Sequence, residues 1–410
     1  MIESLCIRCR GKGLCGKPCK ILSRFIEKAP KPKLHFSGSS PPEIFVGRIN
    51  YPNVFSGILA PSDYGEKETE ILSTPEQWVS KDLQIDEILE LRGQLIYGRG
   101  ISHIKSVNEI SSKNLKQVTA ELALSDRPVS TEFFLKKLPT QEFTANKLFT
   151  IMTNPAPIKK VSLEENPHVH KKVDYLTSDY DVKAVTALGE LYKTNQITTT
   201  HLQKLFSAGL LGTKNKRKMV PTRWSITAVD DTLGKKLLEK IRYYPEINKI
   251  ELFHHDYNGN HFEILLLPSA WSFEVIEVSV KGNVWGGVDK NYFMQDYESF
   301  FPRKSYAENV VGAYYADRLA VLEYLEKIKK QASVLVLHEE RPEYYAPLGV
   351  GIIRESIRKM FSSEKKENPI SIEDAFSLIK TRTDLVEEYK SRSWLLKNYG
   401  KQKKITDWFN

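Results

Sequence analysis

Cysteine is scarce in this sequence, and none occurs beyond the first nineteen residues. Its thiols are Cys6, Cys9, Cys15 and Cys19, so the remaining chain cannot carry a disulfide framework. Clustered thiols in a reducing compartment indicate a metal site, because disulfides seldom persist there. Gaps of two, five and three residues between successive cysteines suit tetrahedral zinc, with an iron–sulfur cluster as the alternative.

Long hydrophobic runs are missing as well. No apolar run reaches the ~18 residues that a membrane-spanning helix needs, which argues against a membrane partner. The opening residues, MIESLCIRC, lack the basic and then apolar layout of a signal peptide. No internal repeat or extended low-complexity tract is present. We therefore expect a cytoplasmic, intracellular protein.

The overall composition is that of a globular protein with a basic surface. The 410 residues are 41% hydrophobic and 27% charged, which is ordinary globular usage and suits two or three domains. The formal net charge of +9 favours polyanionic partners such as DNA. A Lys/Glu-rich surface also occurs in thermophilic proteins, so charge alone does not identify the partner.

Segment composition predicts a mixed α/β or α+β fold with a zinc knuckle at one end and a flexible tail at the other. The predicted parts are a basic zinc-binding module (1–35), a main domain (36–361) that can split into two lobes near residue 180, a helical segment (370–396) and the tail (397–410). The Pro-, Ser- and Gly-rich stretch 29–42 and the stretch 362–369 predict linkers.

Hydrophobic spacing places several elements inside the main domain. It predicts helices over 82–92 and 306–332, two amphipathic helices within 182–212, strands within 247–280 and a buried strand over 333–340. Asn258-Gly259 predicts a tight hairpin turn between two of the strands.

The last nine residues, QKKITDWFN, hold three large apolar side chains. Ile405, Trp408 and Phe409 share one face of a helical turn, and burying them gives roughly 5–9 kcal/mol before the ordering cost. An affinity on the order of micromolar remains after that cost. With Gln402 at the rim, this pattern resembles the PCNA-interacting peptide that docks proteins on the sliding clamp. The alternative is a terminal turn packed on the protein's own core.

The basic centre of the chain, 211–237, combines cations, an aromatic and carboxylates. Arg223 can hold phosphate while Trp224 stacks a base and the Ser225 hydroxyl donates. Lys214 and Arg217 precede them in a charge run. Asp230 and Asp231 can hold a divalent cation such as Mg²⁺ or Mn²⁺, or act as a base; alternatively one caps a helix beginning near residue 232.

Two later segments carry further candidates for phosphate binding. Arg303 and Lys304 precede a predicted helix, whose first N–H groups also favour anions. Arg341 and Tyr344 follow the predicted buried strand, in the kind of loop that often carries function. If the segments converge, Arg223 and Arg303 would neutralise phosphate while Asp230 or Asp231 holds a metal or orients water.

Long motifs along the chain resemble the archaeal Nre DNA repair family. They are the cysteine cluster, FVGRINYPNV (45–54, with Arg48), RKMVPTRWSITAVDDTLGKKL (217–237), RKSYAENVVGAYYADRLAVLEYL (303–325), VLVLHEERPEYYAPLGVGIIRESIR (334–358) and the terminal peptide. The resemblance implies an archaeal source, DNA damage repair and zinc on Cys6, Cys9, Cys15 and Cys19. It also implies recruitment to the clamp through Gln402, Ile405, Trp408 and Phe409.

The reaction is left open by this resemblance, and three functions compete. The first is a hydrolase of a phosphodiester or phosphoanhydride, in DNA or in a free nucleotide such as NAD or ATP. Arg48, Lys214, Arg217, Trp224, Ser225, Lys304, Arg341 and Tyr344 would then bind phosphate or nucleotide, with Arg223, Asp230, Asp231 and Arg303 as the catalytic set. The second is a clamp-recruited adaptor that only binds DNA, and the third is a scaffold without a catalytic site.

Overall fold

The structure is a computed structural model. It describes residues 9, 14, 16, 18–27, 29, 31, 33–62, 69–105, 115–194, 196–283, 286, 289–363 and 365–401. The chain forms two compact units, the first comprising Met1–Leu233 with Ala346–Ile352 and the second Gly234–Tyr345 with Ile353–Asn410. The division therefore falls at Leu233, whereas the sequence pointed to a split near residue 180.

The first unit is organised around a six-stranded sheet in the order β1-β5-β8-β4-β3-β2. Its strands are β1 (His35–Ser40), β2 (Ile44–Val46), β3 (Asn53–Pro61), β4 (Leu95–His103), β5 (Val129–Leu135) and β8 (Pro155–Leu163). Neighbours run antiparallel except β4 and β8, which are parallel. Two short strands, β6 (Phe143–Thr144) and β7 (Met152–Thr153), pair separately.

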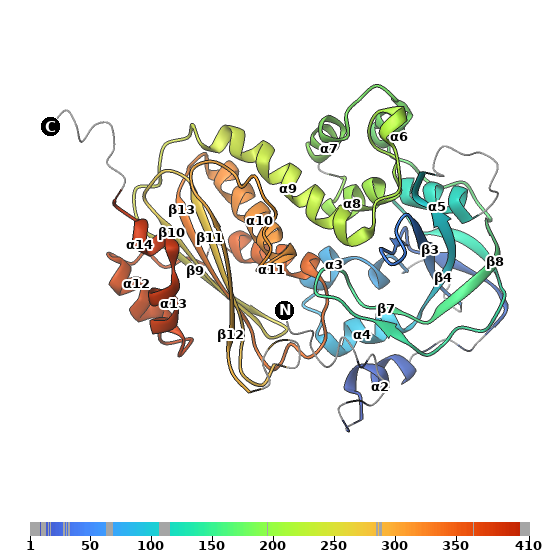
Figure 1. Ribbon diagram of the computed structural model, residues 1–410, viewed down its shortest axis with the longest axis horizontal. Helices are drawn as coiled ribbons and strands as arrows, with labels where there is room; N and C mark the ends of the chain where they lie inside the picture. Colours follow the sequence, from blue (N-terminus) through green and yellow to red (C-terminus); the bar gives the residue numbers. More distant parts are fainter. Residues whose placement is uncertain are drawn as a thin grey trace. The chain divides into compact units, whose positions relative to one another are not determined.

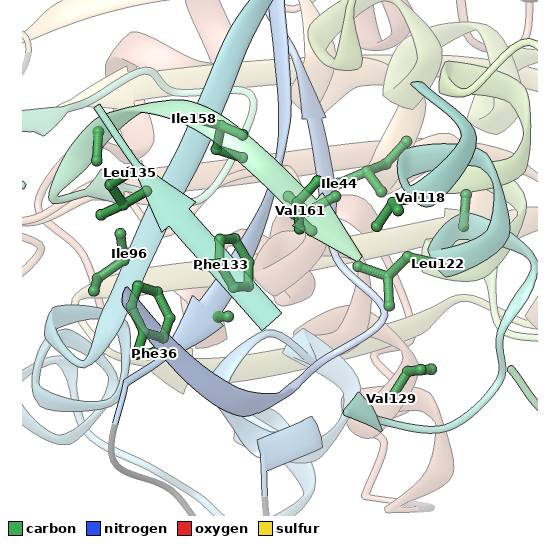
Figure 2. Packing of buried hydrophobic residues seen from close by; sticks show 14 of the residues in the cluster. Phe36, Ile44, Ile96, Val118, Leu122, Val129, Phe133, Leu135, Ile158 and Val161 are labelled. Atoms are coloured by element: carbon green, nitrogen blue, oxygen red, sulfur yellow. The ribbon is translucent and has the colours of Figure 1, made fainter. Parts of the chain in front are cut away.

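Helices surround this sheet. They are α2 (Lys20–Glu27), α3 (Pro75–Ser80), α4 (Ile85–Gly93), α5 (Leu115–Leu124), α6 (Lys171–Ser178), α7 (Ala184–Tyr192), α8 (Thr199–Ser207) and the first part of α9 (Thr222–Ile241), with 3₁₀ turns η1 (Thr69–Leu72) and η3 (Lys214–Lys216). Figure 2 shows Val118 and Leu122 of α5 beside Ile44 and Val161 from the strands, in a cluster of buried apolar side chains. Each such side chain stabilises the unit by about 1.5–3 kcal/mol when fully buried.

The stretch 29–42 is not a linker, contrary to the prediction from its composition. Its second half is β1, which pairs with β5 over all six of its residues. Phe36 supplies the reason, since its ring stacks on Phe133 with centroids 4.8 Å apart and is 5% exposed. Small serine and glycine side chains elsewhere in β1 let the strand lie close to its neighbours. At Gly38 a Cβ would meet the Pro61 carbonyl oxygen.

A buried arginine ties several segments of the first unit together. Arg92 at the end of α4 is fully buried and donates from Nη1 and Nη2 to the two carboxylate oxygens of Glu43, at 2.6 and 3.1 Å. Its other donors reach the carbonyl oxygens of Ile151 and Leu72 at 3.1 and 3.0 Å. One side chain thus holds the β2, η1 and β7 regions against α4.

The second unit contains a five-stranded sheet in the order β12-β11-β13-β10-β9. Its strands are β9 (Glu251–Tyr257), β10 (Asn260–Leu267), β11 (Ser272–Ser279), β12 (Tyr292–Glu298) and β13 (Ser333–Glu340). The predicted hairpin is confirmed: Asn258 and Gly259 have φ of 52° and 76° between the paired strands β9 and β10. The predicted buried strand is also confirmed, since every residue of β13 is buried.

Helices cover both faces of this sheet (Figure 1). Figure 1 shows α10 (Gly312–Ile328) and α11 (Val350–Ser362) on one side, and α12 (Ile372–Ile379), α13 (Val386–Arg392) and α14 (Trp394–Asn398) on the other. The last three helices pack their apolar side chains with sheet residues in one core cluster, so the predicted C-terminal helical segment is part of the second unit. No helix in the described part of the chain has the length and apolar character that crossing a bilayer would require.

Candidate nucleic-acid interface

The long helix α9 begins against β2 and α8 of the first unit. The Thr222 hydroxyl accepts a hydrogen bond from the Val46 backbone N–H at 2.9 Å and lies 3.3 Å from the Ser207 hydroxyl. Pro221 immediately before the helix accepts from the backbone N–H groups of Trp224 and Ser225. The first turn of α9 is therefore fixed in place, and the side chains that it presents are held at defined positions.

Trp224 on this turn faces solvent beside a second exposed aromatic ring. Its side chain is 45% exposed and Tyr51 is 41% exposed, with ring centroids 5.4 Å apart and planes inclined by 58°. Tyr51 belongs to the turn between β2 and β3, where its N–H donates to the Arg48 carbonyl. Arg48 is exposed and Arg223 partly buried. We call these four residues, Arg48, Tyr51, Arg223 and Trp224, the α9 patch.

Aromatic rings interleaved with arginines are suited to nucleic acid. Every base has a π-face, so stacking on Trp224 or Tyr51 would be tolerant of sequence, while Arg48 supplies charge for phosphate. Lys214, Lys216 and Lys218, in the connection leading to α9, are exposed and add positive charge. The sequence identified Trp224, Arg223 and Arg48 but missed Tyr51, whose only signal is its position three residues after Arg48.

Two predicted phosphate ligands have structural partners instead. Arg217 is 6% exposed, and its guanidinium donates to the carbonyls of Gly212, Thr177 and Asp179 at 2.6–2.7 Å. Burial lowers its pKa. Ser225 is fully buried and donates to the Gln203 carbonyl at 2.6 Å. The prediction of direct phosphate contact does not agree with this burial, because neither polar group is presented to solvent.

The two aspartates lie in the interior of α9, so the alternative of a helix cap near residue 232 is wrong. The helix begins ten residues earlier, at Thr222. Asp230 is 1% exposed and accepts from the Gln203 amide at 3.0 Å, while Asp231 is partly buried. Among the residues that the structure describes, no group of three or more His, Cys, Asp or Glu side chains could hold a metal ion.

The remaining predicted residues belong to the second unit. Arg303 donates to the carbonyls of Tyr297 and Tyr306 and lies 3.2 Å from the Asp296 carboxylate. Lys304 is exposed. Since Arg223 and Arg303 fall in different units, their convergence stays a prediction.

Arg341 and Tyr344, after β13, are also held by neighbours. Arg341 pairs with Glu339 at 2.9 Å and with Asp256 at 3.2 Å, and its third contact is the Arg382 carbonyl at 2.9 Å. Tyr344 is 3% exposed. Two carboxylates compensate the charge of Arg341, which makes it a weaker candidate for phosphate than Arg48.

Two of the four predicted zinc ligands, Cys9 and Cys19, lie among the residues that the structure describes. Cys9 is buried and its Sγ accepts the Leu14 N–H at 3.3 Å, while the Sγ of Cys19 accepts the Leu22 N–H at 3.4 Å. Sulfur that accepts backbone N–H groups fits a metal-bound thiolate, because such bonds orient and stabilise the ligand. Cys6 and Cys15 lie outside the described residues, as do Gln402, Ile405, Trp408 and Phe409.

Comparison with known proteins covers nearly the whole chain. Residues 14–286 match the family model described as archaeal Nre, N-terminal, and residues 298–408 match archaeal Nre, C-terminal. The DNA repair protein NreB of Archaeoglobus fulgidus is 35% identical over 98% of both chains. The DNA repair protein NreA of the same organism is 36% identical over 94% of this chain and 95% of its own length. NreA of Haloferax volcanii is 36% identical over 80% of this chain and 78% of its own length. No solved structure matches significantly.

Proposed function

The chain belongs to the archaeal Nre family, and from this membership we propose that it is a DNA repair protein that binds DNA through the α9 patch. The supporting observation is the exposed pair of rings, Tyr51 and Trp224, beside Arg48. Rings of this kind stack on bases only where bases are unpaired or displaced. The preferred ligand is therefore single-stranded or locally opened DNA rather than an intact duplex.

The C-terminal peptide would bring this surface to its substrate. Gln402, Ile405, Trp408 and Phe409 would dock on the sliding clamp, and the protein would accompany the clamp on DNA. The knuckle at the other end of the chain would bind one zinc ion through Cys6, Cys9, Cys15 and Cys19. Zinc there would staple a segment too short to form a core of its own.

A hydrolase of phosphodiesters or phosphoanhydrides has less support. Such a site needs several cations that converge on one phosphate. Arg217 is committed to backbone carbonyls, and Arg303 and Arg341 are paired with carboxylates. The contacts of these three arginines favour DNA binding without hydrolysis.

Trp224→Ala is expected to weaken binding to a single-stranded oligonucleotide by roughly 10-fold or more, because loss of one stacked base costs about 1–3 kcal/mol. Fluorescence anisotropy at fixed salt measures the effect. Tyr175→Ala is the matched control, since Tyr175 is a 69% exposed aromatic of the same unit outside the patch. Equal affinities of wild type and Trp224→Ala would exclude the α9 patch as the binding surface.

Arg48→Ala should act differently from Trp224→Ala. Losing one phosphate contact makes the salt dependence weaker: the negative slope of log K against log salt decreases in magnitude by about 0.7 for a single strand. The base-stacking variant should leave that slope unchanged. The two slopes together tell whether the patch contacts both the bases and the backbone.

A third prediction concerns the tail. Changing Trp408 and Phe409 to Ala in the full-length protein should weaken binding to the sliding clamp by roughly 50-fold, because both anchoring rings are removed. Surface plasmon resonance on immobilised clamp measures it. Lys404→Ala, in the same tail, is the control. Retained clamp binding by the double variant would mean that another surface makes the contact.

A further inference from the structure

A small pocket lies beside the α9 patch within the first unit. One face of α8 lines it through Thr200, Gln203, Lys204 and Ser207, at the i, i+3, i+4 and i+7 spacing of a helix stripe. Ile44 and Phe45 of β2 and Thr222 and Ile226 of α9 form other walls. The patch follows directly in sequence on both walls, because Arg48 and Tyr51 come just after β2 while Arg223 and Trp224 come just after Thr222.

The pocket is small and its backbone is closely packed. Its volume is about 80 Å³, roughly half that of a cavity that holds benzene. It can therefore take a short carbon chain but not a whole base. Gly349 on its wall has a φ of +82°, and a Cβ there would lie 2.7 Å from the Thr150 backbone nitrogen. Only glycine fits this position.

Lys204 is the one cationic side chain among the lining residues. It is partly buried, and the described residues give its amine no hydrogen-bond or ion-pair partner. Burial lowers the pKa of the amine, although the carboxylates of Glu43, Glu76 and Glu70 act in the opposite direction and Arg92 adds to the lowering. A desolvated lysine of this kind is the usual nucleophile toward carbonyl carbon.

The carboxylates near Lys204 differ in whether they have hydrogen-bond partners. Glu43 is bound to Arg92 through both oxygens. Both oxygens of Glu76, in the first turn of α3, are buried and have no hydrogen-bond partner among the described residues. The neighbouring Ser73 hydroxyl, whose residue lines the pocket, is also without one. The polar atoms around the pocket thus include groups that a bound hydroxylated ligand could satisfy.

We propose that Lys204 is a nucleophile that forms an imine with the open-chain aldehyde of an abasic deoxyribose in DNA held by the α9 patch. The neutral amine attacks C1′ and gives a carbinolamine, which loses water to form the C=N bond. Hydrolysis by one water reverses the step, so no oxidant or reductant is consumed. Because an abasic nucleotide carries no base, its sugar can enter a pocket that is too small for a whole base. This inference rests on the proposed DNA binding.

Borohydride trapping tests the inference directly, because reduction of the imine links protein and DNA irreversibly. The substrate is a labelled oligonucleotide with one abasic site, incubated with the full chain and sodium cyanoborohydride. We expect a crosslinked band with wild type, and a rate lower by roughly 100-fold with Lys204→Met. Lys137→Met, at an exposed lysine of the same unit outside both the α9 patch and the pocket, is the matched control and should leave the rate unchanged. Equal trapping by wild type and Lys204→Met would overturn the proposal.

A second substrate separates failure of this chemistry from failure of DNA binding. An oligonucleotide with tetrahydrofuran in place of the abasic sugar has no aldehyde and reports binding alone. Binding of this DNA without trapping of the aldehyde DNA would overturn the lysine chemistry and keep the proposed function. No binding of either DNA would overturn the proposed function itself. Lys204→Met must bind the tetrahydrofuran DNA as wild type does, which also verifies its folding.

Free aldehydes present the same chemical group without DNA. Trapping is therefore repeated in the presence of 2-deoxyribose 5-phosphate at the same concentration as the abasic oligonucleotide. Undiminished crosslinking to the oligonucleotide supports DNA as the source of the aldehyde. Complete competition at equal concentrations of the two would show that the site takes a free sugar phosphate, and would overturn the assignment to abasic DNA.

Discussion

Replacing Arg92 with methionine is expected to lower the free energy of unfolding of the first unit by about 3–5 kcal/mol. The substitution leaves the Glu43 carboxylate, which is 16% exposed, without its partner. It also removes the donors to the carbonyls of Leu72 and Ile151. Each buried acceptor left unsatisfied costs about 1–3 kcal/mol. Denaturant unfolding, with hydrogen exchange at β3 and β4 to localise the effect, measures it.

A second arginine on the same unit provides the control. Arg24 pairs with Asp86 at 3.0 Å, but the two side chains are 40% and 46% exposed. Arg24→Met should therefore cost no more than about 1 kcal/mol. Combining Arg92→Met with Glu43→Gln should recover part of the loss, because no buried charge is then left unpaired. Similar losses for Arg92→Met and Arg24→Met would contradict the assigned role of Arg92.

The second large effect is a dependence of stability on pH that arises from His261 in β10. Its side chain is 1% exposed, and Nδ1 lies 2.8 Å from the Asp256 carboxylate. Nε2 lies 3.2 Å from a carboxylate oxygen of Glu263, as a close ionic contact rather than an aligned hydrogen bond. Burial lowers the pKa of His261, but the contacts with Asp256 and Glu263 outweigh burial and raise it to about 9. The Arg341 charge acts in the lowering direction.

The sign of the effect follows from comparing the folded and unfolded states. The pKa of His261 is about 9 in the folded state and 6.5 in the unfolded state. The protonated ring therefore stabilises the folded state fully below pH 6.5, and this contribution is lost as the pH rises through 9. The difference between the two pKa values corresponds to about 3 kcal/mol.

The wild-type protein should thus lose about 3 kcal/mol more than the variant His261→Gln between pH 6 and pH 10. Urea unfolding of both proteins across this range is the measurement. Groups other than His261 titrate equally in both proteins, so the difference between the two curves isolates the histidine. Parallel curves would show that the pKa of His261 is the same in the folded and unfolded states.

The elements that sequence patterns determine are those set by local backbone preferences. The spacing of apolar residues identified α4, and Asn258-Gly259 specified a hairpin turn whose two residues both need positive φ. A continuous β-branched and apolar run predicted β13 to the residue. Local pattern misjudged β1, because its serines and glycine resemble a linker until Phe133 and Pro61 are brought beside them.

The sequence alone was enough to identify the family, because the comparison uses the residues of long motifs and does not depend on how those motifs fold. Which partners the individual polar side chains bind was decided only by the tertiary structure. Arg217 donates to Thr177, forty residues earlier, and Val46 donates to Thr222 across 176 positions. Residue spacing along the sequence cannot predict partners this far apart. Burial and long-range carbonyls removed Arg217 and Ser225 from the exposed surface, and the same packing placed Tyr51 beside Trp224 and Lys204 in a pocket.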